Sequence, residues 1–313
     1  MNNSYNIRAL DNVKVLVVIV TFNARNWIER CLCNLSASGM EVHPYVIDNG
    51  SIDGSQDYLK QHNIDFFQSE ENLGFGKANN LGLQKALDEG YDYVYLLNQD
   101  AWVLPETLST LLKVHRKHPE YGVLSPMQLQ ANEQHFDQNF LENVIGTAQI
   151  GRERLEEGLF FHNLSDVYEV NFVMAAHWLI SRQCLEKVGG FSPTFPHYGE
   201  DENYLHRCQY WGLKVGIVPS AKAVHDRENR KTTEEKHQYI IRYIEALKRA
   251  SLPVNPIHID KYIKAYIRGG IFGCDKYMRK YAYRLYCERK DIIRNRDISM
   301  SQHTAFLKFS NHD

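Results

Sequence analysis

Apolar residues in the first hundred positions form short runs that are separated by amphipathic stretches. The run at residues 13–20 (VKVLVVIV) is continuous and rich in β-branched residues, which is typical of a strand covered on both faces of a sheet. Shorter apolar runs predict further strands at 45–47, 64–68 and 93–97. Amphipathic spacing predicts helices between them at 27–35, 56–61 and 77–89. This alternation predicts an α/β fold with a mainly parallel central sheet flanked by helices.

Polar clusters directly follow three of the predicted strands, at residues 21–23 (TFN), 48–51 (DNGS) and 98–100 (NQD). In a parallel sheet, ligands bind beyond the carboxyl ends of the strands. We therefore expect these three clusters to meet in one crevice. Each cluster taken alone also fits an ordinary strand-end turn, and Asp53 or Ser55 can cap the helix that follows the second cluster.

The rest of the chain is less regular up to residue 231. Further helices are predicted at 106–117, 181–188 and 200–212, and strands at 167–180 and 214–218. Residues 118–166 have no clear period and stay unassigned. Beyond Thr232 the chain is helical and basic. We therefore expect an α/β domain over 1–231 and a basic, mainly helical C-terminal extension over 232–313.

Two carboxylates stand where we expect chemistry. Asp100 follows an apolar strand, and hard cations such as Mg²⁺ or Mn²⁺ prefer carboxylate oxygens and often share their shell with substrate phosphates. Asp201 lies between Glu200 and Glu202, and like charges this close are costly unless a cation or a proton-transfer role compensates. We expect Asp201 to act as a general base, although an acidic helix N-terminus explains the run equally well. His225 is either a metal ligand or an ordinary loop residue.

Seven segments follow one another along the chain as a recognisable series. They are VVIVTFN (17–23), DNGSIDGS (48–55), ENLGFGKANNLGL (71–83), LLNQDAWVLPETL (96–108), GGF (189–191), YGEDENYLHR (198–207) and VH (224–225). The series resembles family 2 glycosyltransferases, particularly their rhamnosyltransferase-like branch. It spans roughly residues 13–227, and its order and spacing make it more specific than any single motif.

The resemblance implies a GT-A fold, a nucleotide-diphosphate sugar as donor and a divalent cation, Mg²⁺ or Mn²⁺, as cofactor. It assigns the catalytic base to Asp201 and the metal contacts to Asp100 and His225. The donor-binding residues that it implies are Thr21, Phe22, Asn23, Asp48, Asn49, Ser51, Asn72, Gly74, Asn80, Asn98 and Gln99. The implied reaction is an inverting transfer of a sugar, with a rhamnose-like sugar expected first, to a hydroxyl of a glycan or lipid-linked acceptor. Such a reaction belongs to the synthesis of cell-surface polysaccharide or glycolipid.

One position departs from the common pattern of the family. Asn98 is neutral where many members have an acid, and the rhamnosyltransferase-like branch commonly has asparagine there. With one charge fewer, we expect weak metal binding before the nucleotide is bound. The chain also lacks the Gln-x-x-Arg-Trp motif and the membrane spans of processive members, so we expect one sugar per visit. The acceptor pocket is expected within residues 128–166.

Two other functions remain open from the sequence. A non-catalytic, nucleotide-sugar-binding partner of another transferase would keep the fold without turnover. A nucleotidyltransferase would need a glycine-rich, basic loop after the first strand, and TFNARNWIER (21–30) has neither property. A dinucleotide dehydrogenase would need GxGxxG at the same turn, where it is absent.

Charge is unevenly distributed along the chain. The 313 residues carry a formal charge of −2, which argues against nucleic acid as a partner, but residues 257–296 alone carry +7. Such a segment predicts peripheral contact with an anionic membrane, or simply a solvated helical face. The first residues do not have the pattern of a signal peptide, so we expect none, no eighteen apolar residues run together, and the six cysteines form no CxxC pair. We therefore expect a cytoplasmic protein, and peripheral contact with the inner face of the membrane stays open beside the solvated helical face.

Overall fold

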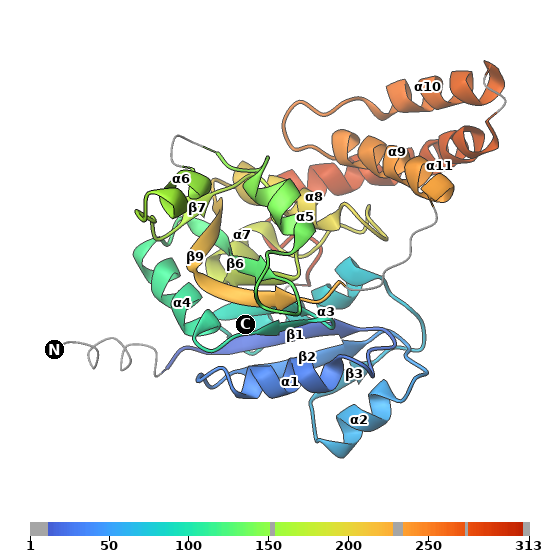
Figure 1. The fold of residues 1–313 in the computed structure, drawn as a ribbon. Coiled ribbons are helices and arrows are strands. Elements are labelled where there is room, and N and C mark those ends of the chain that lie inside the picture. The colour runs from blue at the N-terminus through green and yellow to red at the C-terminus, as the bar shows by residue number, and fades with distance from the viewer. Residues whose placement is uncertain (1–11, 151–153, 228–233, 273–274, 309–313) are drawn as a thin grey trace.

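One nine-stranded sheet forms the centre of the molecule in the computed structural model, which describes residues 12–150, 154–227, 234–272 and 275–308 (Figure 1). The strand order is β3-β2-β1-β4-β8-β6-β9-β5, and β7 pairs with β9. The chain therefore crosses the sheet repeatedly, as expected for an α/β fold.

The first four strands are parallel and follow the predicted pattern. They are β3 (Phe66–Gln68), β2 (His43–Asp48), β1 (Val15–Thr21) and β4 (Tyr93–Asn98). Leu16 and Val18 of β1 enter one apolar core while Val17 and Ile19 enter the core on the other face, so β1 is covered on both sides as predicted. The register pairs Thr21 with Asp48 and Val20 with Asn98, so the polar strand ends lie side by side.

Beyond β4 the sheet is mixed. Its strands are β8 (His177–Ser181), β6 (Tyr121–Leu129), β9 (Lys214–His225), β5 (Ala101–Val103) and β7 (Tyr168–Glu169). β8 is antiparallel to β4 and to β6, whereas β6 and β9 are parallel. The strand predicted at 214–218 continues to His225, and β6 lies in the region that the sequence left unassigned. The predicted parallel order thus describes the first half of the sheet.

Helices cover both faces of this sheet. On one face lie α3 (Phe75–Asp88), α7 (Arg182–Val188) and α8 (Glu200–Tyr210), and on the other lie α1 (Ile28–Ser36), α2 (Ser55–Gln61) and α4 (Thr107–Lys117). A Cβ at Gly82 would lie 2.5 Å from both γ-carbons of Val18, so α3 packs closely on β1. Short turns of helix, α5 (Gln138–Phe140), the π-helical η2 (Leu141–Ile145) and α6 (Leu155–Phe160), follow β6.

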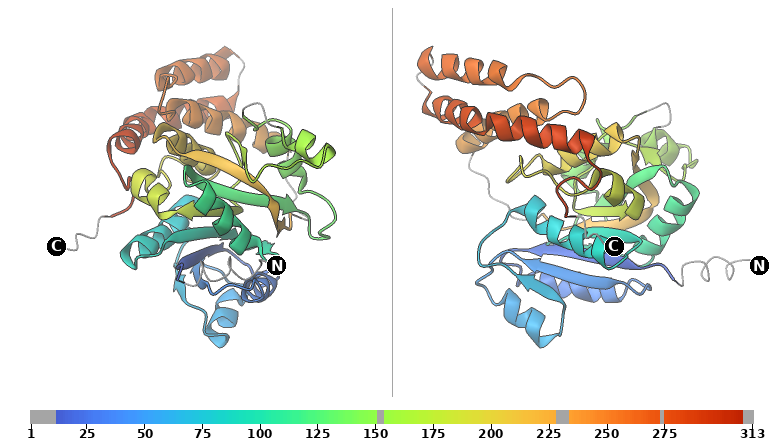
Figure 2. Two further views of the ribbon diagram at one scale, coloured as in Figure 1. Left: turned by 90° about the vertical axis from the view of Figure 1, so that its left-hand side faces the viewer. Right: turned by 180° about the vertical axis from the view of Figure 1, so that it is seen from behind.

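Three C-terminal helices form a separate layer with its own apolar core. They are α9 (Glu234–Ala250), α10 (Ile259–Phe272) and α11 (Lys276–Ser301), and Figures 1 and 2 show them stacked beyond α8 at the end of the molecule opposite α1 and α2. α11 is tied to the sheet domain, since Trp211 Nε1 donates to the carbonyl of Ser299 at 3.1 Å and Asn295 Nδ2 donates to Thr194 Oγ1 at 3.1 Å. No helix among the described residues is both long and apolar enough to cross a bilayer.

Residues 302–308 return from α11 to the sheet domain. The amide of Gly190 donates to the carbonyl of Ala305 at 2.8 Å, and the amide of Thr304 donates to the carbonyl of Glu186 at 3.0 Å. Gly189 has φ +82° and ψ −143°, a region that is open essentially to glycine alone. A Cβ there would also overlap the backbone of Ala305. Gly189 and Gly190 therefore form the surface on which the returning tail packs, and we call this pair of residues the seat of the tail.

Replacing Gly189 with alanine should lower the free energy of unfolding by more than about 2 kcal/mol, because backbone strain and steric overlap add. Gly39→Ala is the matched control. Gly39 has φ +73° but nothing within 4 Å of its missing Cβ, so only the strain of a left-handed residue applies, about 1 kcal/mol. Urea denaturation measures the free energy of unfolding of both variants. Equal losses would contradict the close packing of the tail on Gly189.

Candidate active site

The carboxyl ends of β1, β2 and β4 open into a cavity of about 460 Å³. Nine of the fourteen residues predicted for the site line it: Phe22, Asn49, Asn72, Gly74, Asn98, Gln99, Asp100, Asp201 and His225. The expected meeting of three polar clusters in one crevice is therefore found. Five predicted residues do not line the cavity and instead bond to the loops and segments around it. They are Thr21, Asn23, Asp48, Ser51 and Asn80.

The loops that follow the three strands are bonded to one another. The amide of Asn49 donates to the carbonyl of Thr21 at 2.7 Å, and the amide of Phe22 donates to Gln99 Oε1 at 2.7 Å. The amide of Asn23 donates to Ser51 Oγ at 2.8 Å. These bonds fix the backbone at the edge of the cavity, so a ligand meets loops that are already positioned.

Asp48 is fully buried beneath this edge. Its carboxylate accepts from Thr21 Oγ1 at 3.1 Å, from the amide and Oγ of Ser51 at 3.0 and 2.5 Å, and from Gln56 Nε2 at 2.7 Å. Four donors thus use the lone pairs that a ribose or a base would need. In this arrangement Asp48 holds the loop that presents Asn49 to the cavity.

Gly74 and Asn80 show two different uses of the segment that opens α3. Gly74 has φ +78°, and a Cβ there would lie 2.5 Å from the carbonyl oxygen of Pro196, so only glycine lets this loop meet the segment before α8. Asn72 Oδ1 accepts from the amide of Gly74 at 2.9 Å. Asn80 points elsewhere, because its amide exchanges two hydrogen bonds with the backbone of Phe191, at 2.9 and 2.7 Å.

Asp100 and His225 are brought together by strand pairing. β5 pairs with β9 so that Ala101 lies opposite His225, and the amide of Asp226 donates to the carbonyl of Asp100 at 2.8 Å. One oxygen of the Asp100 carboxylate lies 3.5 Å from His225 Nε2, and both side chains are buried. A buried carboxylate and imidazole therefore face each other at the floor of the cavity.

His177 lies next to His225, with the two ring centroids 6.5 Å apart. Its Nδ1 contacts the hydroxyl of Tyr95 at 2.8 Å, and its Nε2 contacts the carbonyl of Val224 at 2.9 Å. Burial lowers the pKa of His177 to about 3, so it carries no charge at neutral pH. The nitrogens of His225 have no hydrogen-bond partner in the described part of the chain, which leaves a nitrogen for a ligand.

The donor set suits one side of a divalent cation. No group of three or more His, Cys, Asp or Glu residues that could hold a metal occurs within the described ranges. Asp100 and His225 supply one oxygen and one nitrogen, and a cation of the Mg²⁺ or Mn²⁺ type can complete its shell with substrate phosphates and water. The residues thus fit a cation that binds together with a phosphate-bearing ligand.

Asp201 stands in the first turn of α8 and lines the same cavity. Tyr198 and Gly199 both have positive φ, +64° and +86°, and this turn directs the start of α8 toward the cavity. Burial raises the pKa of Asp201 to about 6. Burial also raises the pKa of Glu200, and the neighbouring charge of Asp201 adds to that effect. A carboxylate with this pKa can take up a proton near neutral pH.

The C-terminal layer reaches this turn through α9. Lys248 Nζ lies 2.6 Å from Glu202 Oε2 and 3.3 Å from Glu245 Oε2. A Cβ at Gly199 would lie 3.0 Å from Cγ2 of Ile244, so α9 packs directly on the start of α8. The charge of Glu202 raises the pKa of Asp201 and that of Lys248 lowers it, although burial has the largest effect.

Comparison with known proteins decides the family. The family model for glycosyl transferase family 2 matches residues 16–189, more than half of the chain. The chain belongs to glycosyl transferase family 2.

Two relatives of this family 2 glycosyltransferase have names that state an activity. The low-salt glycan biosynthesis hexosyltransferase Agl10 of Haloferax volcanii is 24% identical over 219 residues, which cover 67% of the chain and 66% of that protein. The N-acetylglucosaminyl-diphospho-decaprenol L-rhamnosyltransferase of Mycobacterium tuberculosis is 26% identical over 239 residues, covering 67% of the chain and 75% of that protein. The predicted resemblance to the rhamnosyltransferase-like branch is confirmed.

The fold is confirmed by a solved structure. The crystal structure of S. aureus TarS 1–349 in complex with UDP-GlcNAc superposes with a TM-score of 0.55 over 92% of the chain and 90% of that chain, at 14% identity. The family 2 glycosyltransferase thus has the predicted GT-A fold with C-terminal helices.

Several residues of the cavity were not predicted. Arg227 lines it and lies 3.0 Å from Asp137 Oδ2 through its Nε, and Phe75 and the segment 174–176 form part of the wall. Tyr198 is half exposed beside Asp201. Tyr198 belongs to the YGED motif and Arg227 follows His225 closely, so proximity to the motifs could have found both. The apolar residues at 174–176 had no such signal.

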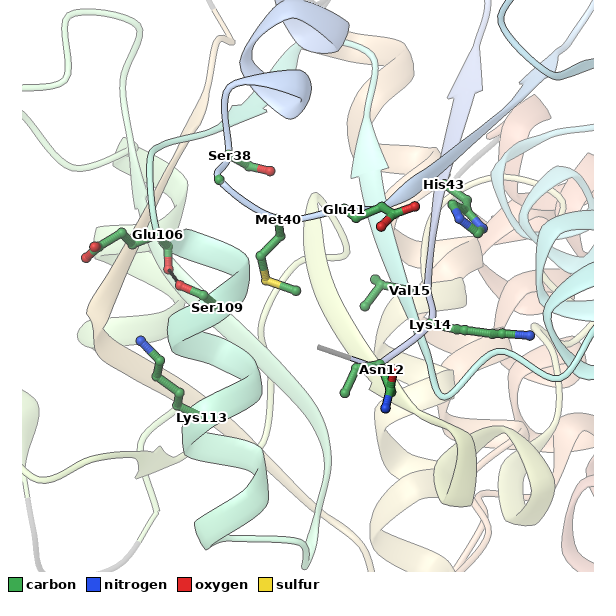
Figure 3. A pocket seen from close by; sticks show the side chains of 12 residues that line it. Asn12, Lys14, Val15, Ser38, Met40, Glu41, His43, Glu106, Ser109 and Lys113 are labelled. Atoms are coloured by element: carbon green, nitrogen blue, oxygen red, sulfur yellow. Dashed lines mark hydrogen bonds between the residues drawn. The ribbon is translucent and has the colours of Figure 1, made fainter. Parts of the chain in front are cut away.

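A larger cavity of about 580 Å³ lies at the other end of the sheet (Figure 3). Lys14 and His43 at the starts of the strands line it, together with Met40, with Glu106 at the N-terminus of α4 and with Lys113 on α4. Figure 3 shows Met40 pointing between these groups. Since a parallel sheet binds ligands beyond the carboxyl ends of its strands, the smaller cavity is the candidate active site of the glycosyltransferase.

Asp48→Asn should lower the free energy of unfolding by about 1–3 kcal/mol, because an amide nitrogen faces buried donors that need an acceptor. Asp57→Asn, on the exposed side of α2, is the matched control and should change it by less than about 0.5 kcal/mol. Thermal or urea unfolding gives both values. If Asp48→Asn kept full stability but lost nucleotide-sugar binding, Asp48 would contact the donor instead of holding the loop.

Proposed function

We propose that this family 2 glycosyltransferase transfers one sugar per visit, with inversion, from a nucleotide diphosphate to an acceptor hydroxyl. The observation that carries the proposal is that Asp201 and the Asp100–His225 pair line one cavity at the carboxyl ends of the parallel strands. A rhamnose-like sugar is proposed first, because a related protein is named as an L-rhamnosyltransferase. A donor-binding site, a base and a candidate cation site are then combined in one place.

The donor is proposed to lie along the strand ends. The ring of Phe22 is 45% exposed at the cavity edge and offers a face for stacking on a planar base, while Asn49 and Asn98 offer amide groups for hydrogen bonds. Other predicted residues are proposed to support the donor site by hydrogen bonds that hold these loops. They are Thr21, Asn23, Asp48, Ser51 and Gln99. Asn80 supports the donor site only through the segment of Phe191.

Asp100 and His225 are proposed to hold the divalent cation, Mg²⁺ or Mn²⁺. When bound, the cation supplies positive charge that neutralises the departing nucleotide diphosphate. Because Asn98 adds no charge, the chain alone offers few ligands, so tight metal binding is expected only with the donor present. Asp100 is therefore expected to act on donor affinity as well as on turnover.

Asp201 is proposed to be the catalytic base. Its carboxylate accepts the proton of the acceptor hydroxyl while that oxygen forms a bond to the anomeric carbon, and the bond from that carbon to the diphosphate oxygen breaks. The nucleotide diphosphate leaves with the electron pair. Since attack and departure occur on opposite faces of the sugar, the anomeric configuration inverts.

The acceptor is proposed to be a glycan or a lipid-linked saccharide, with its pocket within residues 128–166. A polar recess formed by Gln130, Gln138 and Glu142 adjoins His225 and Arg227 and suits a hydroxyl-rich ligand. We further propose a cytoplasmic location and a division into a catalytic domain over 1–231 and a helical extension over 232–313. The separate apolar core of α9, α10 and α11 supports that division.

Asp201→Asn should lower turnover by roughly 10²–10⁴-fold and leave donor affinity unchanged, because only proton transfer is lost. Asp100→Ala should weaken both donor affinity and turnover. A thermal-shift screen of nucleotide sugars with and without Mn²⁺ identifies the donor, and calorimetry and nucleotide release then measure binding and turnover. Near-normal turnover of Asp201→Asn would remove Asp201 as the base.

The pH profile gives a second test of the base. kcat/KM should fall below about pH 6, because burial raises the pKa of Asp201 to about 6 and the protonated form cannot accept a proton. Lys248→Met removes a charge that lowers this pKa, so the acidic limb should move to higher pH. Glu202→Gln removes a charge that raises it, so the limb should move to lower pH. Lys60→Met, on exposed α2, is the control, and shifts in one common direction would contradict the assignment.

A further inference from the structure

The outer side of α10 is both basic and apolar. Its exposed residues recur at helical spacing, Lys261, Lys264, Ile267, Arg268, Ile271 and Phe272, while Ile259 and Ile263 face the core of the C-terminal layer. Ile271 is 60% exposed and Phe272 is 86% exposed. Figures 1 and 2 show α10 as the outermost helix of this layer. Large apolar side chains therefore stand in solvent among cations.

The first half of α11 has a second surface of the same kind. Its exposed residues also follow helical spacing and are Lys276, Arg279, Lys280, Tyr283, Tyr286 and Lys290. Tyr283 is 72% exposed and Tyr286 is 54% exposed. α10 and α11 pack against each other, and we call the exposed residues named here on the two helices the basic–aromatic face.

Acids near this face are already engaged. Asp275 caps α11 by accepting from the amides of Tyr277 and Met278, at 2.8 and 3.2 Å, and Glu288 is paired with Arg284 at 2.8 Å. Asp260, in the first turn of α10, lies 3.4 Å from the ring of His258. Among the described residues, none of the lysines and arginines of the basic–aromatic face forms an ion pair. The face therefore carries a strong positive charge that its own helices do not balance.

On other helices of the same chain, surface lysines and arginines form ion pairs with acids. Lys85 pairs with Glu89 on α3, Arg182 with Glu186 on α7 and Arg249 with Glu245 on α9, each at a spacing of four residues. An ordinary solvated helix face is built in this way. The basic–aromatic face lacks such pairs and exposes isoleucine, phenylalanine and tyrosine instead, which is the composition of a helix that lies on an anionic lipid surface.

We propose that the basic–aromatic face binds the surface of a membrane that contains anionic lipids. The lysines and arginines contact lipid phosphates, and Ile271, Phe272 and the tyrosines enter the headgroup region. This inference rests on the proposed function in one respect. Membrane binding brings the enzyme to a lipid-linked acceptor, which the proposed function names. The face belongs to the same C-terminal layer as α9, whose Lys248 pairs with Glu202 in the turn of Asp201.

Vesicle flotation of the full chain tests the proposal without any turnover. The protein should float with vesicles of phosphatidylcholine and phosphatidylglycerol, fail to float with phosphatidylcholine alone, and be released by salt. The triple variant Lys261→Gln, Lys264→Gln, Arg268→Gln should bind roughly 100-fold more weakly, since each cation near an anionic surface contributes several-fold. Phe272→Ser should also weaken binding and leave the unfolding curve unchanged, because the ring is exposed.

Lys14→Gln, Lys60→Gln, Arg116→Gln is the matched control, which removes three exposed cations elsewhere and should bind as the unaltered protein does. Equal loss in both triple variants would show a response to net charge and overturn the proposal. Absence of flotation with anionic vesicles would do the same, as would binding to a soluble anionic polysaccharide such as heparin with none to vesicles. Each of these results leaves the assignment of Asp201 untouched, because donor binding and turnover are measured separately.

Discussion

The alignment of the carboxyl ends of β2, β1 and β4 is the constraint on which the site depends. Because these strands are parallel, Asp48 lies beside Thr21 and Asn98 lies beside Val20, so the three strand ends are neighbours. β1 lies at the centre of this alignment, and its side chains are buried in the apolar cores on both faces of the sheet. The loops then need only a few hydrogen bonds, such as that from Phe22 to Gln99, to form a continuous edge.

The parallel half of the fold could be predicted because each of its strands is a local apolar run followed at once by a polar turn. The second half could not, because its strands depend on partners that are distant in sequence. β6 includes Ser125, Pro126 and Gln128, which interrupt any apolar period, yet all three are buried. Pro126 is tolerated because the pairing with β9 shifts register directly after it, which is where a sheet accepts proline.

The site shows the same division. Asp100, Asp201 and His225 were predicted from motifs, and the structure brings them to one cavity. What the motifs could not reveal is which residues hold others in place. Asp48 and Asn80 belong to the same series of segments as Asp100, but hydrogen bonds to Ser51 and Phe191 occupy their side chains. Burial and partner geometry, which distinguish a contact residue from a supporting one, arise only after distant segments have packed.

The return of residues 302–308 to the sheet domain has a consequence for how the protein is made. The seat for this tail, Gly189 and Gly190, adjoins Phe191, whose backbone is held by Asn80 of α3. During synthesis the seat leaves the ribosome more than one hundred residues before the tail that fills it. The bonds of this tail to Glu186 of α7 and Gln84 of α3 therefore form only after the three C-terminal helices have been translated.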